Sequence, residues 1–149
     1  MHDMNILRNK YRALYDIDGI SKEYLVKIEH ELQIKLPNDF REISSFYSGG
    51  DVGGKNIHSF LFSDPTNLIE ETLRIREAVD LPNRFVVIAE QAESIIVMDT
   101  ENKPSIIWLD SVEITKLDEQ DFIAKPDVWE EFSDFFNYIL DDEEEERKY

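Results

Sequence analysis

The chain contains no cysteine, few histidines and no apolar run long enough to span a bilayer. Without cysteine there are no disulfides, no thiolate chemistry and no cysteine-ligated zinc, and a reducing compartment is favoured. A membrane helix needs about 20 consecutive apolar residues, so a membrane span is excluded as well. The first residues also lack the apolar segment of a secretory signal. We therefore expect a cytoplasmic protein.

The few histidines and the many carboxylates form no recognisable catalytic pattern. His2, His30 and His58 are far apart, and neither an H-E-x-x-H spacing nor a G-x-S-x-G elbow is present. Pairs of acidic residues are frequent, but in so acidic a chain they arise by chance. A paired-acid hydrolase needs its carboxyls about 5–10 Å apart, which spacing alone does not show. The sequence predicts no enzyme, no catalytic or metal-binding residue and no cofactor.

Basic residues are scarce: 16 lysines and arginines stand against 33 acidic residues, a net charge of −17. Residues 141–149 carry six acidic and two basic side chains, a net −4, which leaves −13 for residues 1–140. Such a field repels nucleic acid and anionic lipid, and it attracts a basic protein partner. The alternative is that the charge serves only solubility.

Helical periodicity dominates the first half of a chain whose 149 residues suit one domain. We predict a helix over residues 4–15 with Ile6 in its apolar stripe, and a second helix capped by Ser21. A third helix begins at Pro37. A fourth is predicted to be capped by Asp64, with proline at its first position.

The second half favours strands. Apolar runs at 84–90, 94–100 and 105–110 are separated by short turns and predict an antiparallel meander. Residues 111–117 are a candidate for one more strand, and the apolar stretch 57–62 is predicted to be an earlier one.

A final helix is predicted from Val128 to residue 140, with Trp129 opening it and phenylalanines along one face. The fold class is therefore α+β: one domain over residues 1–140, with N-terminal helices, a largely antiparallel central sheet and a closing C-terminal helix. The acidic tail, 141–149, is expected to fray because negative charge opposes the dipole at a helix C-terminus.

The stretch S-G-G-D-V-G-G-K-N-I (48–57) has the Gly49…Gly54-Lys55 skeleton of a phosphate-binding loop. A true P-loop lies between a strand and a helix N-terminus, whereas here a helix precedes the glycines. Asn56 stands where a magnesium-binding hydroxyl belongs, and Asp51 would repel phosphate. We interpret the stretch as a glycine-rich turn with an exposed face.

The segment I-S-K-E-Y-L-V-K-I-E-H-E-L-Q-I-K-L-P-N-D-F-R-E-I-S-S-F-Y-S-G-G (20–50) resembles the SUKH superfamily, the Smi/Knr-like domains. The resemblance rests on these positions: Ile28, Glu29, Leu32, Leu36, Pro37, Asp39, Phe40 and the glycine pair 49–50. The later strands and the F-S-D-F-F-N-Y-I-L helix are also similar, so the likeness covers residues 20–140.

This resemblance implies a function without catalysis. Bacterial members are typically immunity proteins that bind and neutralise a cognate polymorphic toxin, often a nuclease, whereas a fungal branch serves as a scaffold. The short chain is closer to the immunity form, and the alternative is an interaction scaffold on the same fold. The expected partner is a toxin with a basic nuclease domain. Neither nucleic acid nor membrane is an expected partner. A homodimer through exposed strand edges is compatible with the sequence, although nothing requires one.

The partner-binding residues are predicted at the strand ends and in the glycine loop, where exposed acids would meet a basic toxin. The predicted set is Asp51, Glu90, Glu93, Asp99, Trp108, Asp110 and Glu113. The alternative is that the acids form a solvated rim and that Trp108 packs in the core.

Overall fold

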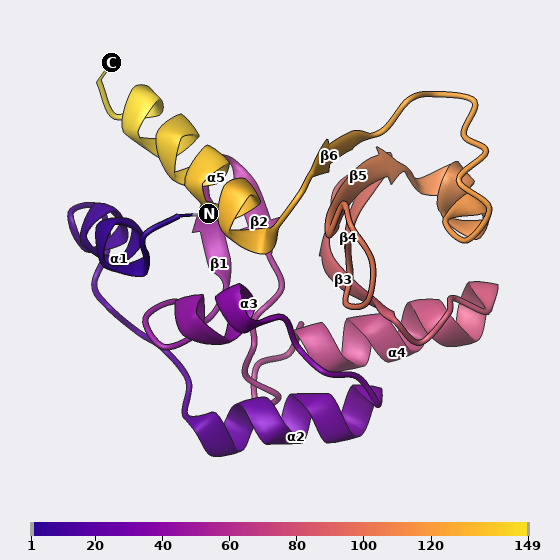
Figure 1. Cartoon of the computed structure of the whole chain (residues 1–149), viewed down its shortest axis with the longest axis horizontal. Helices are drawn as coiled ribbons and strands as arrows, with labels where there is room; N and C mark the ends of the chain where they lie inside the picture. The colour runs from indigo at the N-terminus through magenta and orange to yellow at the C-terminus, as the bar shows by residue number, and fades with distance from the viewer. Residues whose placement is uncertain (1, 149) are drawn as a thin grey trace.

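The computed structural model describes residues 2–148 and has an α+β architecture, as predicted (Figure 1). The elements in chain order are α1 (Met4–Arg12), α2 (Lys22–Leu32), α3 (Asn38–Ile43), β1 (Gly50–Val52), β2 (Lys55–Ile57), α4 (Leu68–Val79), β3 (Phe85–Glu90), β4 (Ser94–Asp99), β5 (Ile106–Asp110), the 3-10 helix η1 (Ser111–Lys116), β6 (Asp127–Trp129) and α5 (Phe132–Glu146). Within residues 2–148, no helix combines the length and the apolar character that crossing a membrane would require.

The main sheet has the order β3-β4-β5-β6, and every neighbouring pair is antiparallel. Both faces are covered, because Val86 and Ile88 join the core beneath the helices while Phe85 and Val87 join a second core with η1. A sheet buried on both faces explains why its strands read as continuous apolar runs. The predicted meander is confirmed.

Figure 1 shows α1, α3, α5 and the β1–β2 hairpin grouped on one side of the main sheet, with α2 and α4 below. The predicted cap of α2 is present, since the Ser21 side chain accepts the Tyr24 N–H at 3.2 Å. Aromatic side chains fill the space between the helices. Phe40 lies 4.8 Å from Phe132 between ring centroids, and Tyr47 lies 5.0 Å from Phe136.

The glycine stretch forms the β1–β2 hairpin, whose turn is Gly53-Gly54 with φ of 59° and 76°. Two positive φ values are what tight two-residue hairpins need, and glycine adopts them without strain. The stretch is therefore a turn, as expected, and no helix follows it to receive a phosphate. The strand predicted at 57–62 was wrong, because only Ile57 belongs to β2.

Helix α4 begins at Leu68, later than predicted. Asn67, not Asp64, is its N-cap, and the Asn67 side chain accepts the Glu70 N–H at 2.9 Å. Asp64 instead accepts a hydrogen bond from the Ser59 hydroxyl in the preceding loop. In α1, Ile6 is exposed and Leu7 takes the buried position, so that part of the predicted stripe was also wrong.

Two further assignments differ near the end of the chain. Residues 111–116 form η1, not a strand. Val128 and Trp129 form β6, which pairs with Ile107 and Ile106 of β5, and α5 begins only at Phe132. The apolar face predicted for α5 holds from Phe132 onward.

The acidic tail was predicted to fray, but α5 continues to Glu146. Its carboxylates have partners that offset the unfavourable dipole. Asp142 pairs with Lys55 at 3.1 Å, and Glu143 accepts the Gly53 N–H at 3.1 Å. Arg147 adds an ion pair with Glu143 at 2.8 Å.

Candidate partner-binding cleft

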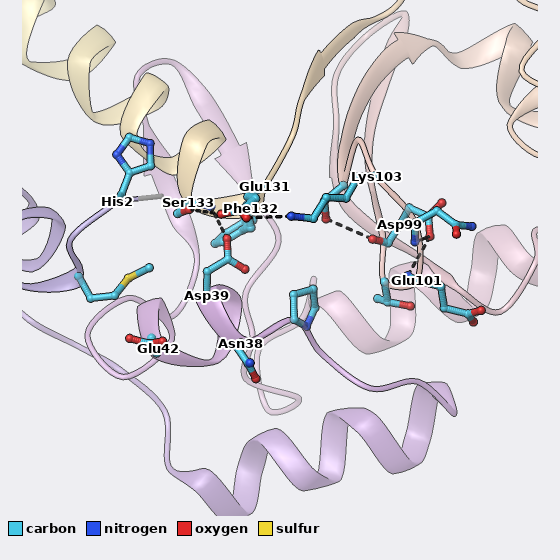
Figure 2. Close-up of a pocket in the computed structure, with 15 residues that line it drawn as sticks. His2, Asn38, Asp39, Glu42, Asp99, Glu101, Lys103, Glu131, Phe132 and Ser133 are labelled. Carbon is cyan, nitrogen blue, oxygen red and sulfur yellow. Dashed lines mark hydrogen bonds and ion pairs between the residues drawn. The ribbon is translucent and has the colours of Figure 1, made fainter.

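A cleft of about 580 Å³ opens between the helical part of the molecule and the main sheet (Figure 2). Its walls come from three segments far apart in sequence: the start of α3, the loop between β4 and β5, and the start of α5. Residues near the N-terminus, His2 and Met4, complete the lining. The cleft is thus assembled by the tertiary fold.

Asp39 joins two walls of the cleft. One carboxylate oxygen accepts the Phe40 N–H at 2.9 Å in the first turn of α3, and the other accepts the Ser133 N–H at 2.7 Å in the first turn of α5. Both N–H groups would otherwise lack partners, because the first turn of a helix has none of its own. Asp39 therefore fixes the angle between α3 and α5.

Glu29 supports the same region from α2. Its carboxylate accepts the Leu36 N–H at 2.7 Å and pairs with Arg41 at 3.0 Å. This contact holds the Leu36-Pro37 segment in place and orients α3 toward the cleft. The sequence motif that carries the family resemblance is thus mainly architecture.

Asp99 lies at the sheet side of the cleft and is only 3% exposed. Its carboxylate accepts the N–H groups of Glu101 and Asn102, each at 3.0 Å, and pairs with Arg84 at 3.2 Å. These contacts shape the β4–β5 loop. Because the carboxylate is buried and already bonded, Asp99 has a structural position and is not available to a partner.

Lys103 reaches from the β4–β5 loop across the cleft to Glu131, with 2.8 Å between Nζ and Oε1 (Figure 2). The Lys103 ammonium holds the pKa of Glu131 below its usual range, and Glu131 raises the pKa of Lys103. Glu131 also caps α5 in a capping box with Asp134. The Lys103 side chain is 55% exposed, so this ion pair is accessible to solvent.

Two carboxylates in the cleft remain free. Glu42 on α3 and Glu101 on the β4–β5 loop lie on opposite sides of it (Figure 2), and both are exposed. Among residues 2–148, neither forms an ion pair. Lys103 is the single lysine or arginine among the lining residues of the described chain. The cleft is therefore acidic, with a mixed polar and apolar floor.

The predicted site residues do not gather in this cleft. Glu93 and Asp110 lie close together at the opposite end of the sheet, where Asp110 is the register partner of Ser94. Both are exposed, and so is Asp51, which faces Asn56 across the β1–β2 hairpin. No ion pair involves these three carboxylates within residues 2–148. They remain candidate contact residues of a separate surface.

Trp108 is half-buried on β5. Its indole N–H donates to the Ser94 hydroxyl at 2.8 Å, and its ring stacks near Trp129 with centroids 6.5 Å apart. The Lys55 ammonium lies 5.4 Å from the ring centroid, a cation–π contact. The indole is thus largely engaged within the molecule, although the residue is not fully buried.

Glu113 is buried, with 3% exposure, although the sequence placed it among the surface acids. Its carboxylate accepts the N–H groups of Ile123 at 2.5 Å and Ala124 at 3.2 Å, and Lys116 lies 3.6 Å away. The hydrogen bond from Ile123 is the main reason that the pKa of Glu113 lies below its usual range. Glu113 therefore anchors the loop that leads to β6.

Glu90 is partly buried at the end of β3. Arg74 binds both of its carboxylate oxygens, at 2.6 and 2.7 Å. Burial raises the pKa of Glu90, but the contacts with Arg74 outweigh it and leave the pKa below its usual value. The Glu90 carboxylate is hence engaged inside the molecule through both of its oxygens.

Sequence reasoning missed the cleft itself, with Asp39, Glu42, Glu101, Lys103 and Glu131. Asp39 was recognised only as a motif residue. A usable signal was present in Pro37-Asn38-Asp39, since an acid in the first turn of a short helix often binds backbone N–H groups. No local signal places Glu101 and Glu42 around one cleft, because only the folded chain brings their segments to it.

These features define an α+β domain with an acidic cleft between helices and sheet. The family model of the SMI1 / KNR4 family (SUKH-1) matches residues 19–138, and the chain belongs to this family. The match contains α2, α3, the main sheet and the beginning of α5. No curated protein matches the sequence.

Proposed function

We propose that this protein is an immunity protein that binds a cognate polymorphic toxin with a nuclease domain and neutralises it in the cytoplasm. Membership in the SMI1 / KNR4 family (SUKH-1) supports this proposal, because the immunity role is the one that the sequence resemblance implies. The protein acts stoichiometrically, as an antitoxin, and needs neither a cofactor nor turnover. Recognition of the partner is its whole activity.

The observation that carries the proposal is the acidic cleft. A nuclease must present basic side chains to its phosphate-bearing substrate. Glu42 and Glu101 offer free carboxylates on two sides of the cleft, and Glu131 offers a third, which pairs with the exposed Lys103 side chain. A surface of this kind imitates the phosphates of the substrate, so it competes for the same basic face of the toxin.

The net charge of −17 supports fast capture as well as recognition. Complementary fields raise association rate constants from about 10⁵–10⁶ to about 10⁸ M⁻¹s⁻¹ or more at low salt. A fast rate matters for an antitoxin, because every uncaptured nuclease molecule damages the cell. Buried anchors at the centre of the contact then supply most of the affinity.

The first test is a co-expression rescue. A toxin-like reading frame adjacent to this gene is induced with and without the protein, and complexes are purified on a tag carried by the toxin. Rescued growth together with a 1:1 or 2:2 complex supports the proposal. Continued cell death with no complex would overturn it and would leave an interaction scaffold as the better interpretation.

Charge reversal then locates the binding face. The Glu42→Lys and Glu101→Lys variants should slow association about tenfold each and weaken its salt dependence. Glu93→Lys and Asp110→Lys probe the opposite end of the sheet, and Asp51→Lys probes the hairpin. Glu31→Lys, an exposed acid on α2 outside the cleft lining, is the charge-matched control. If only the sheet-end or hairpin variants slow association, the cleft is not the binding face.

A further inference from the structure

Three side chains with metal-binding chemistry meet on the side of the molecule where α4 crosses the end of β3. His58 follows β2, Glu71 is on α4, and Glu90 ends β3, and one ligand atom from each lies within 4.8 Å of the others. The backbone N–H of His58 donates to the Ile88 carbonyl at 2.9 Å, which holds the histidine beside β3. The three residues are far apart in sequence, so no spacing motif could reveal them.

A cation already occupies the space between the two carboxylates. The Nη2 atom of Arg74 lies 3.0 Å from Glu71 Oε1 and 2.6 and 2.7 Å from the two oxygens of Glu90. Arg74 stands one helical turn after Glu71, and its side chain is 52% exposed. The guanidinium can therefore leave this position without disturbing the core.

His58 is the member that Arg74 does not satisfy. The residue is 7% exposed, and its buried Nε2 has no hydrogen-bond partner among the described residues. It lies 3.3 Å from Glu90 Oε2, but without hydrogen-bond geometry. Burial lowers the pKa of His58 below its usual value. A buried polar nitrogen without a partner costs roughly 1–3 kcal/mol.

We propose that His58, Glu71 and Glu90 form a binding site for a divalent transition-metal ion, with Zn²⁺ as the best-fitting candidate, and that Arg74 is the resident cation that the metal displaces. A single guanidinium offsets one of the two carboxylate charges and leaves the imidazole unused, whereas a divalent metal ion balances both charges and uses all three groups. One imidazole nitrogen and two carboxylate oxygens form a ligand set that zinc accepts. The carboxylate charge favours a divalent over a monovalent cation.

Such a metal would join three segments: the chain after β2, helix α4 and the end of β3. These segments connect the helical part of the molecule to the main sheet, so the site acts as a structural clamp. The proposal is independent of toxin binding, since none of the three residues lines the cleft.

The test uses the full chain, freed of metals with a chelator, in a non-coordinating buffer at pH 7.5. ZnCl₂ is titrated by calorimetry and in thermal unfolding. We expect one Zn²⁺ per chain and a rise in Tm of roughly 5–10 °C at a hundredfold excess over Kd. Glu71→Gln and Glu90→Gln should each weaken binding at least tenfold. Arg74→Gln should strengthen it about tenfold, because the competing cation is gone.

Two controls make the result specific. Glu93→Gln removes an exposed acid outside the cluster and should leave Zn²⁺ affinity unchanged. In imidazole NMR spectra of the unmodified protein, Zn²⁺ should shift the His58 nitrogens and leave His2 and His30 in place. The proposal is overturned if no saturable binding occurs, if the Glu71 and Glu90 variants bind as tightly as the parent, if Arg74→Gln does not bind more tightly, or if a histidine other than His58 responds.

Discussion

The two ends of the main sheet contain acidic residues that look alike in sequence and differ in the folded protein. At the end that borders the cleft, Asp99 is buried and bonded to Arg84 and two backbone N–H groups. At the other end, Glu93 and Asp110 face solvent without an ion pair among residues 2–148. A buried carboxylate requires partners, whereas an exposed one is already solvated. The comparison separates acids that hold the fold from acids that can meet a partner.

The largest expected effect is on the buried side of this comparison. In Asp99→Ala, Arg84 keeps only its ion pair with Asp118 among the described residues. The substitution also removes the acceptor of the Glu101 and Asn102 N–H groups. We expect a loss of about 3 kcal/mol in the free energy of unfolding, measured by urea denaturation. Asp110→Ala is the matched control and should change it by less than about 0.5 kcal/mol. Equal losses in the two variants would contradict the view that buried Asp99 holds the fold while exposed Asp110 does not.

The second prediction compares two acids at the same end of the sheet, Glu113 and Glu93, by the pH dependence of the protein's stability. The pKa of Glu113 is lowered in the folded state, chiefly by the Ile123 N–H, so the folded protein binds fewer protons than the unfolded chain. Its contribution to stability is present above the unfolded pKa, near 4.5, and is lost as pH falls through the folded pKa.

Glu113→Gln should therefore lower stability at pH 7 and flatten its decline below pH 4.5, as followed by urea midpoints between pH 7 and pH 3. Glu93→Gln removes an exposed carboxylate from the same end and serves as the control. If both variants flatten the decline of stability with falling pH equally, protonation of Glu113 is not what destabilises the protein in acid.

The third prediction concerns the exposed acids. Glu93→Lys and Asp110→Lys should leave the urea midpoint within about 0.5 kcal/mol of the parent, because no internal contact is lost. An effect on toxin association that exceeds the effect of Glu42→Lys would move the proposed interface to this end of the sheet. Stopped-flow association at two salt concentrations gives the answer.

The smallest expected effect is at Lys103. Lys103→Met removes the cation that covers Glu131 and makes the cleft more acidic, so a basic partner should bind a few-fold more tightly. Calorimetry with the purified toxin measures the change in affinity. Lys125→Met, which removes a lysine outside the cleft, is the control. Weaker binding by Lys103→Met would mean that the lysine itself contacts the partner.

Much of the fold could be predicted because the local patterns agreed with the final packing. The strands β3, β4 and β5 are apolar except at their ends, and α2 has a good cap at Ser21 and a regular buried face. Errors arose where a tertiary contact overruled a local signal. Asp64-Pro65 is a good helix start, but Asn67 is the residue that the Ser59 loop positions to cap α4. Val128 and Trp129 fit a helix, yet β5 offers them an open edge.

The site was harder to predict than the fold. Charge and the family motif indicated a protein that binds a basic partner, but not which acids are free. Asp99 and Glu113 became internal anchors because loops fold back onto them. Glu42 and Glu101 line the same cleft, whose walls depend on Asp39 joining α3 to α5 and on Asp99 shaping the loop. These relationships connect residues distant in sequence, and a single sequence does not contain their distances.

The attachment of the β1–β2 hairpin to α5 has a consequence for variation within the family. A Cβ at Gly53 would lie 2.5 Å from the Ile139 carbonyl oxygen, so the turn rests directly on the helix backbone. Asp142 and Glu143, which hold the same turn, lie beyond the family match that ends at residue 138. We expect relatives with a different helix end to carry a differently placed hairpin, so this corner can diverge while the shared framework stays the same.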